Sequence, residues 1–408
     1  MSSDQPLEKK RWLILFIICV INLCAGSIYA WSVLSAAAAV SLSESTGTVI
    51  TASDLAIAFG VANSVGPIPM ILGGAFNDKY GPRLVIMTGG LLIGLGLCGC
   101  GFASSVMEMT IAYGLVFGLG LGLAYGAGIS TAVKYFPDRR GLAGGLVTAA
   151  YGFSSVLVPP IAQALTEQFG IMQTFIVLGV VFGAIIMTGS IFCQRCPDNF
   201  LPAGMQVKTH TNSQGKTWQE MLTSPVFYPM IALLMCGAIS GMMILSQAAS
   251  IAKVEIGMST AAATGAVSTI ALFNMAGRLT AGFLSDSLGR IGVLLAALAC
   301  STLGLLVLIN SGYGDTLMFY LGCVLIGIAF GAFMAIYPGF TTDQFGARHA
   351  GVNYGIMFSG FSLAGLSGPI LMQYMQNTGL SFAQCCMAGI AFCVMGGVFA
   401  YIYARLIN

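Results

Sequence analysis

The sequence predicts an all-α membrane protein with twelve transmembrane helices in two pseudo-symmetric halves of six. Of its 408 residues, 57% are hydrophobic and 7% are charged, whereas a soluble domain carries roughly 25% charged residues. Short polar breaks separate twelve apolar runs of about twenty residues, each long enough to cross the hydrocarbon core of a bilayer. Similar motifs around Asp78 and Asp286 lie 208 residues apart, about half the chain, which indicates an internal repeat.

The basic residues predict the topology. If both termini are cytoplasmic, the Lys and Arg residues all fall on the cytoplasmic side except two. Lys253 would lie outside, and Arg278 lies within an apolar run. Few sequences place their positive charges so consistently, so we expect cytoplasmic termini.

The predicted halves are residues 1–193 and 223–408. The stretch 194–222 between them is the one long polar segment of the sequence, and we expect it to form a cytoplasmic linker. His210 in this stretch is expected to be an ordinary solvated histidine. The twelve cysteines lie almost wholly in the apolar runs, where cysteine behaves as a small hydrophobic residue, so no disulfide framework is expected.

The first apolar run predicts a retained transmembrane helix over residues 12–38. It is too long for a signal peptide and leads into further helices. Asn22 and Ser27 interrupt it with polar side chains, and Tyr29 adds an aromatic one. Polar groups at this depth face a bundle interior or a cavity. Hydrogen bonding to a neighbouring helix is an equally good explanation for Asn22 and Ser27.

Prolines and glycines predict how helices of the first half bend and pack. The second helix is expected over residues 54–77, with a kink at Pro67 and Pro69 because proline lacks an amide donor. The fourth helix carries a stripe of small residues, which allows a neighbouring helix to approach closely. This stripe consists of Gly114, Gly118, Gly122 and Gly126.

A loop motif follows both the second and the eighth expected helix. Its two copies consist of Gly74, Asp78, Gly81 and Arg83, and of Gly282, Asp286, Gly289 and Arg290. They resemble the loop signature of the major facilitator superfamily, G-x-x-x-D-x-x-G-[R/K], although Pro82 displaces the arginine of the first copy by one residue. The resemblance implies the major facilitator fold and a gating role for the motif residues.

A second signature begins at Tyr135. The segment YFPDRRGLAGG resembles the monocarboxylate transporter signature Y-F-x-K-R-R-x-L-A-x-G, with Asp138 in place of the lysine. Arg139 and Arg140 match its two arginines, and we group them with the gating motif. The repeat also appears here at an offset of 210 residues, since Gly141, Gly145 and Pro159 correspond to Gly351, Gly355 and Pro369.

Arg278 is the most unusual residue of the sequence. It precedes Asp286 by eight residues in an apolar stretch, so at about 1.5 Å per residue it lies roughly 12 Å inside the polar end of its helix. A cation at this depth costs about 2.5–3.5 kcal/mol, and arginine cannot lose its proton to avoid the cost. The repeat places apolar Met70 opposite it, so the scaffold itself does not require the charge.

The neighbours of Arg278 favour an anion-binding site. Asn274 lies one turn earlier on the same helix face and can orient the guanidinium or bind the same ligand. No Asp or Glu is expected at mid-membrane depth, so the obvious internal counter-ion is missing. The alternative is an arginine tied to helix carbonyls or to a carboxylate of the protein. We favour a small organic anion, because arginine binds a carboxylate through two parallel hydrogen bonds.

The chain as a whole resembles the bacterial oxalate/formate antiporter family and the related monocarboxylate transporters. In that family, aromatic residues enclose a small carboxylate against an arginine of the eighth helix. Two departures stand out, because this chain has Phe361 where the oxalate exchanger has a lysine and Ile28 where it has a glutamine. With one cation, we expect a monocarboxylate of the lactate, pyruvate or formate type. The expected substrate-binding residues are Arg278, Asn274, Tyr29, Tyr125, Tyr151, Phe330, Met334 and Phe361.

These observations predict a secondary active transporter, and not an enzyme, in the bacterial inner (plasma) membrane. Its partners would be the monocarboxylate, with a proton or a counter-transported anion, and the lipid bilayer. No cofactor, metal or nucleic acid is expected, and a monomer would suffice. The alternatives are a dicarboxylate exchanger of the oxalate type, a porter for sugars or drugs, and a sensor without transport.

Overall fold

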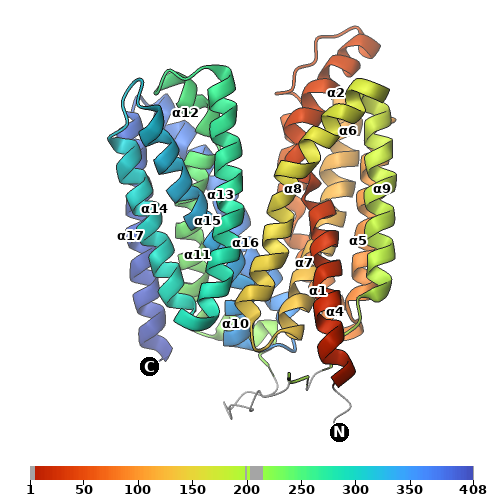
Figure 1. Cartoon of the computed structure of the whole chain (residues 1–408), viewed down its shortest axis with the longest axis vertical. Coiled ribbons are helices and arrows are strands. Elements are labelled where there is room, and N and C mark those ends of the chain that lie inside the picture. The colour runs from red at the N-terminus through yellow and green to blue at the C-terminus, as the bar shows by residue number, and fades with distance from the viewer. Residues whose placement is uncertain (1–4, 198–199, 203–214, 408) are drawn as a thin grey trace. The chain divides into compact units, whose positions relative to one another are not determined.

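The chain is helical at almost every described position (Figure 1). The computed structural model describes residues 5–197, 200–202 and 215–407, and it contains no strand within these ranges. Twelve helical segments in this part are long and apolar enough to cross a membrane, so the predicted helix count and helical membrane fold are confirmed. His210 and much of the predicted linker lie outside the described residues.

The first membrane-crossing segment is longer than predicted. It runs over Glu8–Thr46 instead of residues 12–38. A short 3₁₀ turn, η1 (Gly26–Ala30), joins α1 (Gln5–Ala25) to α2 (Trp31–Thr46). The helical segment therefore extends beyond the apolar run at both ends. The added residues are largely polar, so a prediction from hydropathy does not include them.

The second segment is interrupted where its kink is predicted, and the kink itself stays a prediction, because Gly66 keeps helical dihedral angles (φ −49°, ψ −44°). Helix α3 (Ala56–Val65) ends one residue before Gly66, and α4 (Pro67–Tyr80) begins directly after it. Proline suits the first position of a helix, where its missing N–H has no intrahelical partner to lose.

The predicted glycine stripe packs against α3 and α4. It extends through the π-helical segment η2 (Thr110–Phe117) into α7 (Gly118–Tyr135). A Cβ atom at Gly118 would lie 2.8 Å from the Cα of Ala62, and one at Gly122 would lie 2.5 Å from the carbonyl oxygen of Gly66. Both distances are shorter than real Cβ contacts, so these positions need glycine for the helices to approach this closely.

The described residues form two compact units. The first contains those within Met1–Asp138, Ala150–Gly215 and Thr342–Ile356. Besides the helices above, it includes α5 (Pro82–Cys100), α6 (Val106–Met109), α9 (Ile171–Phe192), residues 150–169 of α8 (Arg140–Phe169) and the start of α16 (Ala350–Asn377). Helix α5 packs against α7 and α9, and these three form much of the core of the unit.

The second unit contains the described residues within Arg139–Ala149, Lys216–Thr341 and Met357–Asn408. In addition to its parts of α8 and α16, its helices are α10 (Trp218–Thr223), α11 (Phe227–Leu245), α12 (Ala248–Val254), α13 (Thr260–Leu288), α14 (Arg290–Ile309), α15 (Thr316–Phe345) and α17 (Phe382–Ile407). Helix α17 packs against α11 and α14. The sequence-based boundaries of the two halves stay a prediction.

The internal repeat is visible in the helix ends. Helices α4 and α13 end at positions 208 residues apart, and the glycines that follow, Gly81 and Gly289, have φ values of 90° and 83°. Only glycine adopts this conformation readily, because it has no Cβ atom. The next helices, α5 and α14, begin at Pro82 and Arg290, also 208 residues apart.

Candidate functional site

Arg278 lies within the membrane-crossing part of α13, ten residues before the helix ends at Leu288. The residue is 3% exposed. Its Nε donates a hydrogen bond of 2.8 Å to Oδ1 of Asn274, one turn earlier on the same helix. The amide of Asn274 therefore fixes the orientation of the guanidinium plane.

A second hydrogen bond joins Arg278 to the beginning of α8, in the same unit. Nη1 donates to the carbonyl oxygen of Thr148 at 2.6 Å. This bond corresponds to part of the alternative considered above, an arginine tied to helix carbonyls. A guanidinium carries five N–H donors, and two of them are used here, which leaves three for a ligand. Within the described part of the chain, no carboxylate forms an ion pair with Arg278.

Helix α15 passes α13 at the level of Asn274 and Arg278. A Cβ atom at Gly331 would lie 3.0 Å from the backbone nitrogen of Arg278, so the two backbones are nearly in contact. Phe330 and Met334 flank this crossing on α15, and both are buried. Phe361 on α16 is half-buried, and its ring centroid lies 5.7 Å from that of Phe330. The structure thus brings Phe330 and Phe361 together in the second unit, with Phe330 next to the crossing of α13 and α15.

The three predicted tyrosines form a cluster in the first unit. The ring of Tyr151 lies 5.4 Å from that of Tyr29 and 4.9 Å from that of Tyr125. Tyr29 is 39% exposed, whereas Tyr125 is 6% exposed. At Gly26, a Cβ atom would lie 2.7 Å from the Cβ of Ser154, so the missing side chain allows α8 to approach η1 beside the cluster. Their role as substrate contacts stays a prediction.

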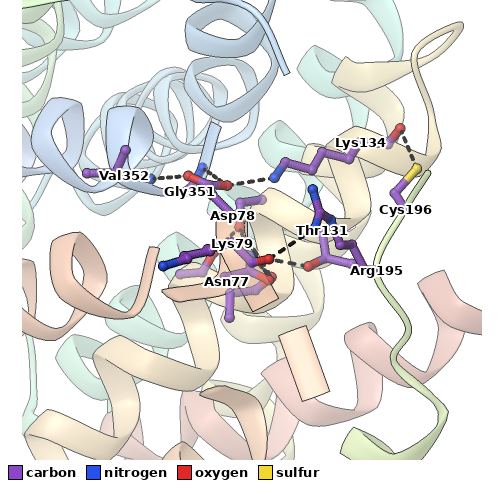
Figure 2. Close-up of polar contacts among 12 residues, drawn as sticks. Asn77, Asp78, Lys79, Thr131, Lys134, Arg195, Cys196, Gly351 and Val352 are labelled. Carbon is purple, nitrogen blue, oxygen red and sulfur yellow. Dashed lines mark hydrogen bonds and ion pairs between the residues drawn. The ribbon is translucent and has the colours of Figure 1, made fainter. Parts of the chain in front are cut away.

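The first copy of the gating motif caps a helix in the first unit (Figure 2). The carboxylate of Asp78 accepts hydrogen bonds of 3.0 Å from the backbone N–H groups of Gly351 and Val352, in the first turn of α16. These N–H groups have no intrahelical acceptor, and a helix N-terminus attracts negative charge. Lys134 Nζ lies 2.6 Å from Oδ1 of the same carboxylate. Asp78 therefore neutralises a helix end and a lysine together.

The second copy makes the equivalent contact in the second unit. Asp286 accepts hydrogen bonds of 2.8 Å from the backbone N–H groups of Gly141 and Leu142, in the first turn of α8. Here the cation is Arg290, whose Nη1 lies 2.8 Å from Oδ1 of Asp286. The motif glycines explain the close approach, since a Cβ atom at Gly282 would lie 2.5 Å from the carbonyl oxygen of Gly141.

The predicted basic residues of the gating motif differ in their contacts. Arg83 and Arg139 are exposed, and their side chains form no hydrogen bond or ion pair with any described residue. Arg140 begins α8, and Gly339 packs against its Cβ. Lys134, which sequence reasoning did not single out, holds the cation position at Asp78 instead. Its place directly before the Tyr135 signature was the only available signal.

The structure also accounts for Asp138, the departure from the signature. Its carboxylate pairs with both terminal nitrogens of Arg11, at 2.8 and 3.2 Å. The Arg11 Cζ lies 4.7 Å from the centre of the Phe136 ring, and its side chain is 8% exposed. The two residues are 127 positions apart, so no local pattern in the sequence announces the pair.

Comparisons with known proteins agree with these features. A family model described as Major Facilitator Superfamily matches residues 15–369. The uncharacterized MFS-type transporter YhjX of Escherichia coli (strain K12) is 26% identical over 366 residues, which cover 89% of this chain and 88% of that protein. The oxalate:formate antiporter of Oxalobacter formigenes is 26% identical over 373 residues, covering 90% and 85%. Monocarboxylate transporter 11 of Mus musculus is 27% identical over 366 residues, covering 85% and 76%.

Solved structures share the fold. The E. coli fucose:proton symporter FucP superposes with a TM-score of 0.69 at 14% identity, covering 98% of this chain and 99% of the symporter. The proton:xylose symporter XylE superposes with a TM-score of 0.71 at 15% identity, covering 98% and 97%. At such low identity the likeness concerns the fold alone, and it confirms the predicted major facilitator architecture.

Proposed function

This chain belongs to the Major Facilitator Superfamily and is a multi-pass secondary transporter, and from this premise we propose that it carries a small monocarboxylate paired to Arg278. Members of this family are transporters rather than enzymes. The proposal concerns the class of substrate, the residue that binds the substrate, and the number of substrate charges that the site can neutralise.

One observation carries the proposal, the environment of Arg278. The guanidinium is buried, and both of its protein acceptors, the amide of Asn274 and the carbonyl of Thr148, are neutral. A buried cation without a counter-ion is unfavourable, so an anionic ligand gains both the Coulomb attraction and the remaining donors. A carboxylate uses two of these donors in parallel, which a spherical anion does not do.

The surroundings of Arg278 favour one carboxylate over two. Phe330, Met334 and Phe361 are apolar, and Phe361 occupies the position at which the oxalate exchanger carries a second cation by the resemblance above. A dicarboxylate would then keep one negative charge without a partner in an apolar region, which is costly. A monocarboxylate with a short organic tail matches both the charge and the apolar surface.

The relatives support a small organic anion and also supply the second candidate. Two of them are named as a monocarboxylate transporter and an oxalate:formate antiporter. A dicarboxylate exchanger is therefore the alternative. The name of the oxalate:formate antiporter favours it, and the presence of a single cation, Arg278, at the candidate site opposes it. The sugar symporters resemble this chain in fold alone.

The proposed mechanism is alternating access in a bacterial inner membrane, with both termini cytoplasmic. The anion pairs with Arg278 from one side and leaves to the other after the halves of the protein rock. The charge is balanced either by a proton that travels with the substrate or by a counter-transported anion. A pH gradient drives uptake in the first case, and preloaded anion drives it in the second.

Uptake into proteoliposomes tests the proposal. Wild-type protein should accumulate labelled lactate, pyruvate or formate in preference to oxalate and xylose. Arg278→Ala should lower the initial uptake rate to the protein-free background. Arg278→Lys should keep little of the wild-type rate, because an ammonium lacks the planar pair of donors.

Arg405→Ala is the matched control. Arg405 is exposed at the end of α17, where its Nε bonds only to the hydroxyl of Tyr401, so its loss should leave uptake unchanged. Wild-type rates in Arg278→Ala would rule out the binding role of Arg278. Preferred uptake of oxalate would replace the monocarboxylate by the dicarboxylate alternative.

A further inference from the structure

The two copies of the gating motif hold their helices in the same way but take their cations from different places. Asp78 and Asp286 each accept two backbone hydrogen bonds from the first turn of α16 and α8, respectively. Arg290 follows Asp286 by four residues, whereas Lys134 comes from the last turn of α7. The carboxylates are otherwise equivalent, so the difference lies in the cation alone.

The first copy of the motif has no cation at the position where the second copy has Arg290. Pro82 corresponds to Arg290, because both directly follow a glycine of positive φ and both begin the next helix. Proline is well suited to this first position, because its fixed φ fits the helix and no intrahelical bond is lost. It has no charge, however. Pro82 therefore allows α5 to begin at the same position as α14, but it gives Asp78 no cation four residues later in the chain.

Arg83, the next residue, does not replace the missing cation. Its side chain is exposed and forms no hydrogen bond or ion pair within the described ranges. A shift of one residue along a helix rotates the side chain by about 100°. This rotation turns Arg83 away from Asp78, even though it restores an arginine to the sequence motif.

Lys134 lies beside the Asp78 carboxylate and takes the place that Arg290 has beside Asp286 (Figure 2). Its side chain is 16% exposed and that of Asp78 is 5% exposed, so the pair is shielded from solvent. Helix α7 is fixed against α4 one turn earlier, where Asn77 Nδ2 donates to the hydroxyl of Ser130 at 2.8 Å. Behind the lysine, the thiol of Cys196 donates to the carbonyl oxygen of Lys134 at 3.5 Å.

From these contacts we infer that Lys134 is the positioning residue of the first motif, and that it does for Asp78 what Arg290 does for Asp286. It balances the charge of the Asp78 carboxylate and keeps it aligned with the first turn of α16. Arg83 has no part in this contact. The inference does not depend on which substrate is carried or on Arg278.

Hydrogen exchange measured by mass spectrometry on the purified full-length protein tests the inference. Lys134→Ala should speed exchange in peptides covering residues 350–355 on the order of tenfold, as expected for the loss of one charge-assisted hydrogen bond beside these amides. Peptides covering residues 140–145 report the second motif in the same sample and should not change. Arg83→Ala is the matched control and should leave both regions as in the wild type.

A rescue variant separates this role from a general loss of stability. In Pro82→Arg/Lys134→Ala, the arginine again follows the aspartate by four residues, and exchange at residues 350–355 should return toward the wild-type rate. Lys134→Arg should also keep most of the protection. Wild-type exchange in Lys134→Ala, an equal effect of Arg83→Ala, or failure of Pro82→Arg to rescue would each overturn the inference. Because the readout is exchange and not uptake, its failure is distinguishable from failure of the proposed transport function.

Discussion

Gly74→Ala is the sharpest test of how the first gating motif is built. Gly74 lies on α4 where this helix crosses the first turn of α16, within the first unit. A Cβ atom at Gly74 would lie 2.5 Å from the carbonyl oxygen of Gly351 and 2.7 Å from the backbone nitrogen of Val352. Both neighbours are backbone atoms, so no flexible side chain can move aside.

The size of the effect follows from these distances. The nearest atom to that Cβ, the carbonyl carbon of Gly351, would lie at 2.4 Å, so an ordinary contact of about 3.4 Å requires α16 to move away by about 1 Å. The hydrogen bonds that the Gly351 and Val352 amides donate to Asp78, 3.0 Å each, would then lengthen to about 4 Å, beyond hydrogen-bond range. Each bond to a charged acceptor contributes about 1.5–3 kcal/mol, and alanine regains about 0.5–1 kcal/mol over glycine in a helix. For the two bonds together, less this gain, we expect a net loss of about 2–5 kcal/mol.

Thermal unfolding of the detergent-solubilised protein measures this loss as a lower transition midpoint. Gly60→Ala is the matched control, because Gly60 lies in helix α3 and a Cβ atom there would meet nothing within 4 Å. It should leave the midpoint unchanged or raise it slightly. If Gly74→Ala were as stable as Gly60→Ala, the crossing of α4 and α16 would not be as tight as argued, and the capping role of Asp78 would lose its structural basis.

Three further predictions concern the candidate site and a buried thiol. Phe361→Lys should raise the ratio of oxalate to lactate uptake, because it adds a second cation to the second unit; an unchanged ratio would contradict the charge-counting argument. Asn274→Asp should place a carboxylate beside Nε of Arg278, now bonded at 2.8 Å, so the apparent KM for a monocarboxylate should rise at neutral pH and fall again as acid protonates the new group; a pH-independent KM would speak against direct pairing. Burial raises the pKa of the Cys193 thiol to about 12, so maleimide should label Cys193 at least about tenfold more slowly in the native protein than after denaturation in SDS; equal rates would mean that this thiol is accessible.

Much of the fold can be predicted from the sequence, because helix length, hydropathy, and the positions of proline and glycine determine most of it. Apolar runs of membrane length gave the twelve helices, and the proline pair gave the break before α4. The glycine stripe of η2 and α7 packs against α3 and α4 as its spacing indicates. The first segment was predicted too short, because its ends at Glu8 and Thr46 lie in polar sequence. Polar residues continue a helix there, and hydropathy carries no information about where such a helix stops.

The contacts around the candidate site were less predictable, because they join residues that are distant in the chain. Asn274 beside Arg278 could be foreseen from helical spacing alone. The bond from Arg278 to the carbonyl of Thr148 could not, because it joins a side chain to a backbone atom 130 residues away. Lys134 was missed for the same reason, since the motif pointed to Arg83 and only the packing of α7 on α4 brings the lysine to Asp78.

The repeat finally separates what the scaffold needs from what the substrate needs. A Cβ atom at Gly145 would lie 2.8 Å from the carbonyl oxygen of Arg278, and one at Gly355 would lie 2.9 Å from the carbonyl carbon of Met70. The backbones around Arg278 and Met70 therefore make equivalent close crossings, and only the side chains differ. A buried methionine satisfies this position in one copy, so packing does not explain an arginine in the other. Beyond packing, the arginine adds only hydrogen bonds to two neutral acceptors, Asn274 and the carbonyl of Thr148, and these leave its charge uncompensated. The proposed anionic ligand is therefore the best explanation for a charge at this position.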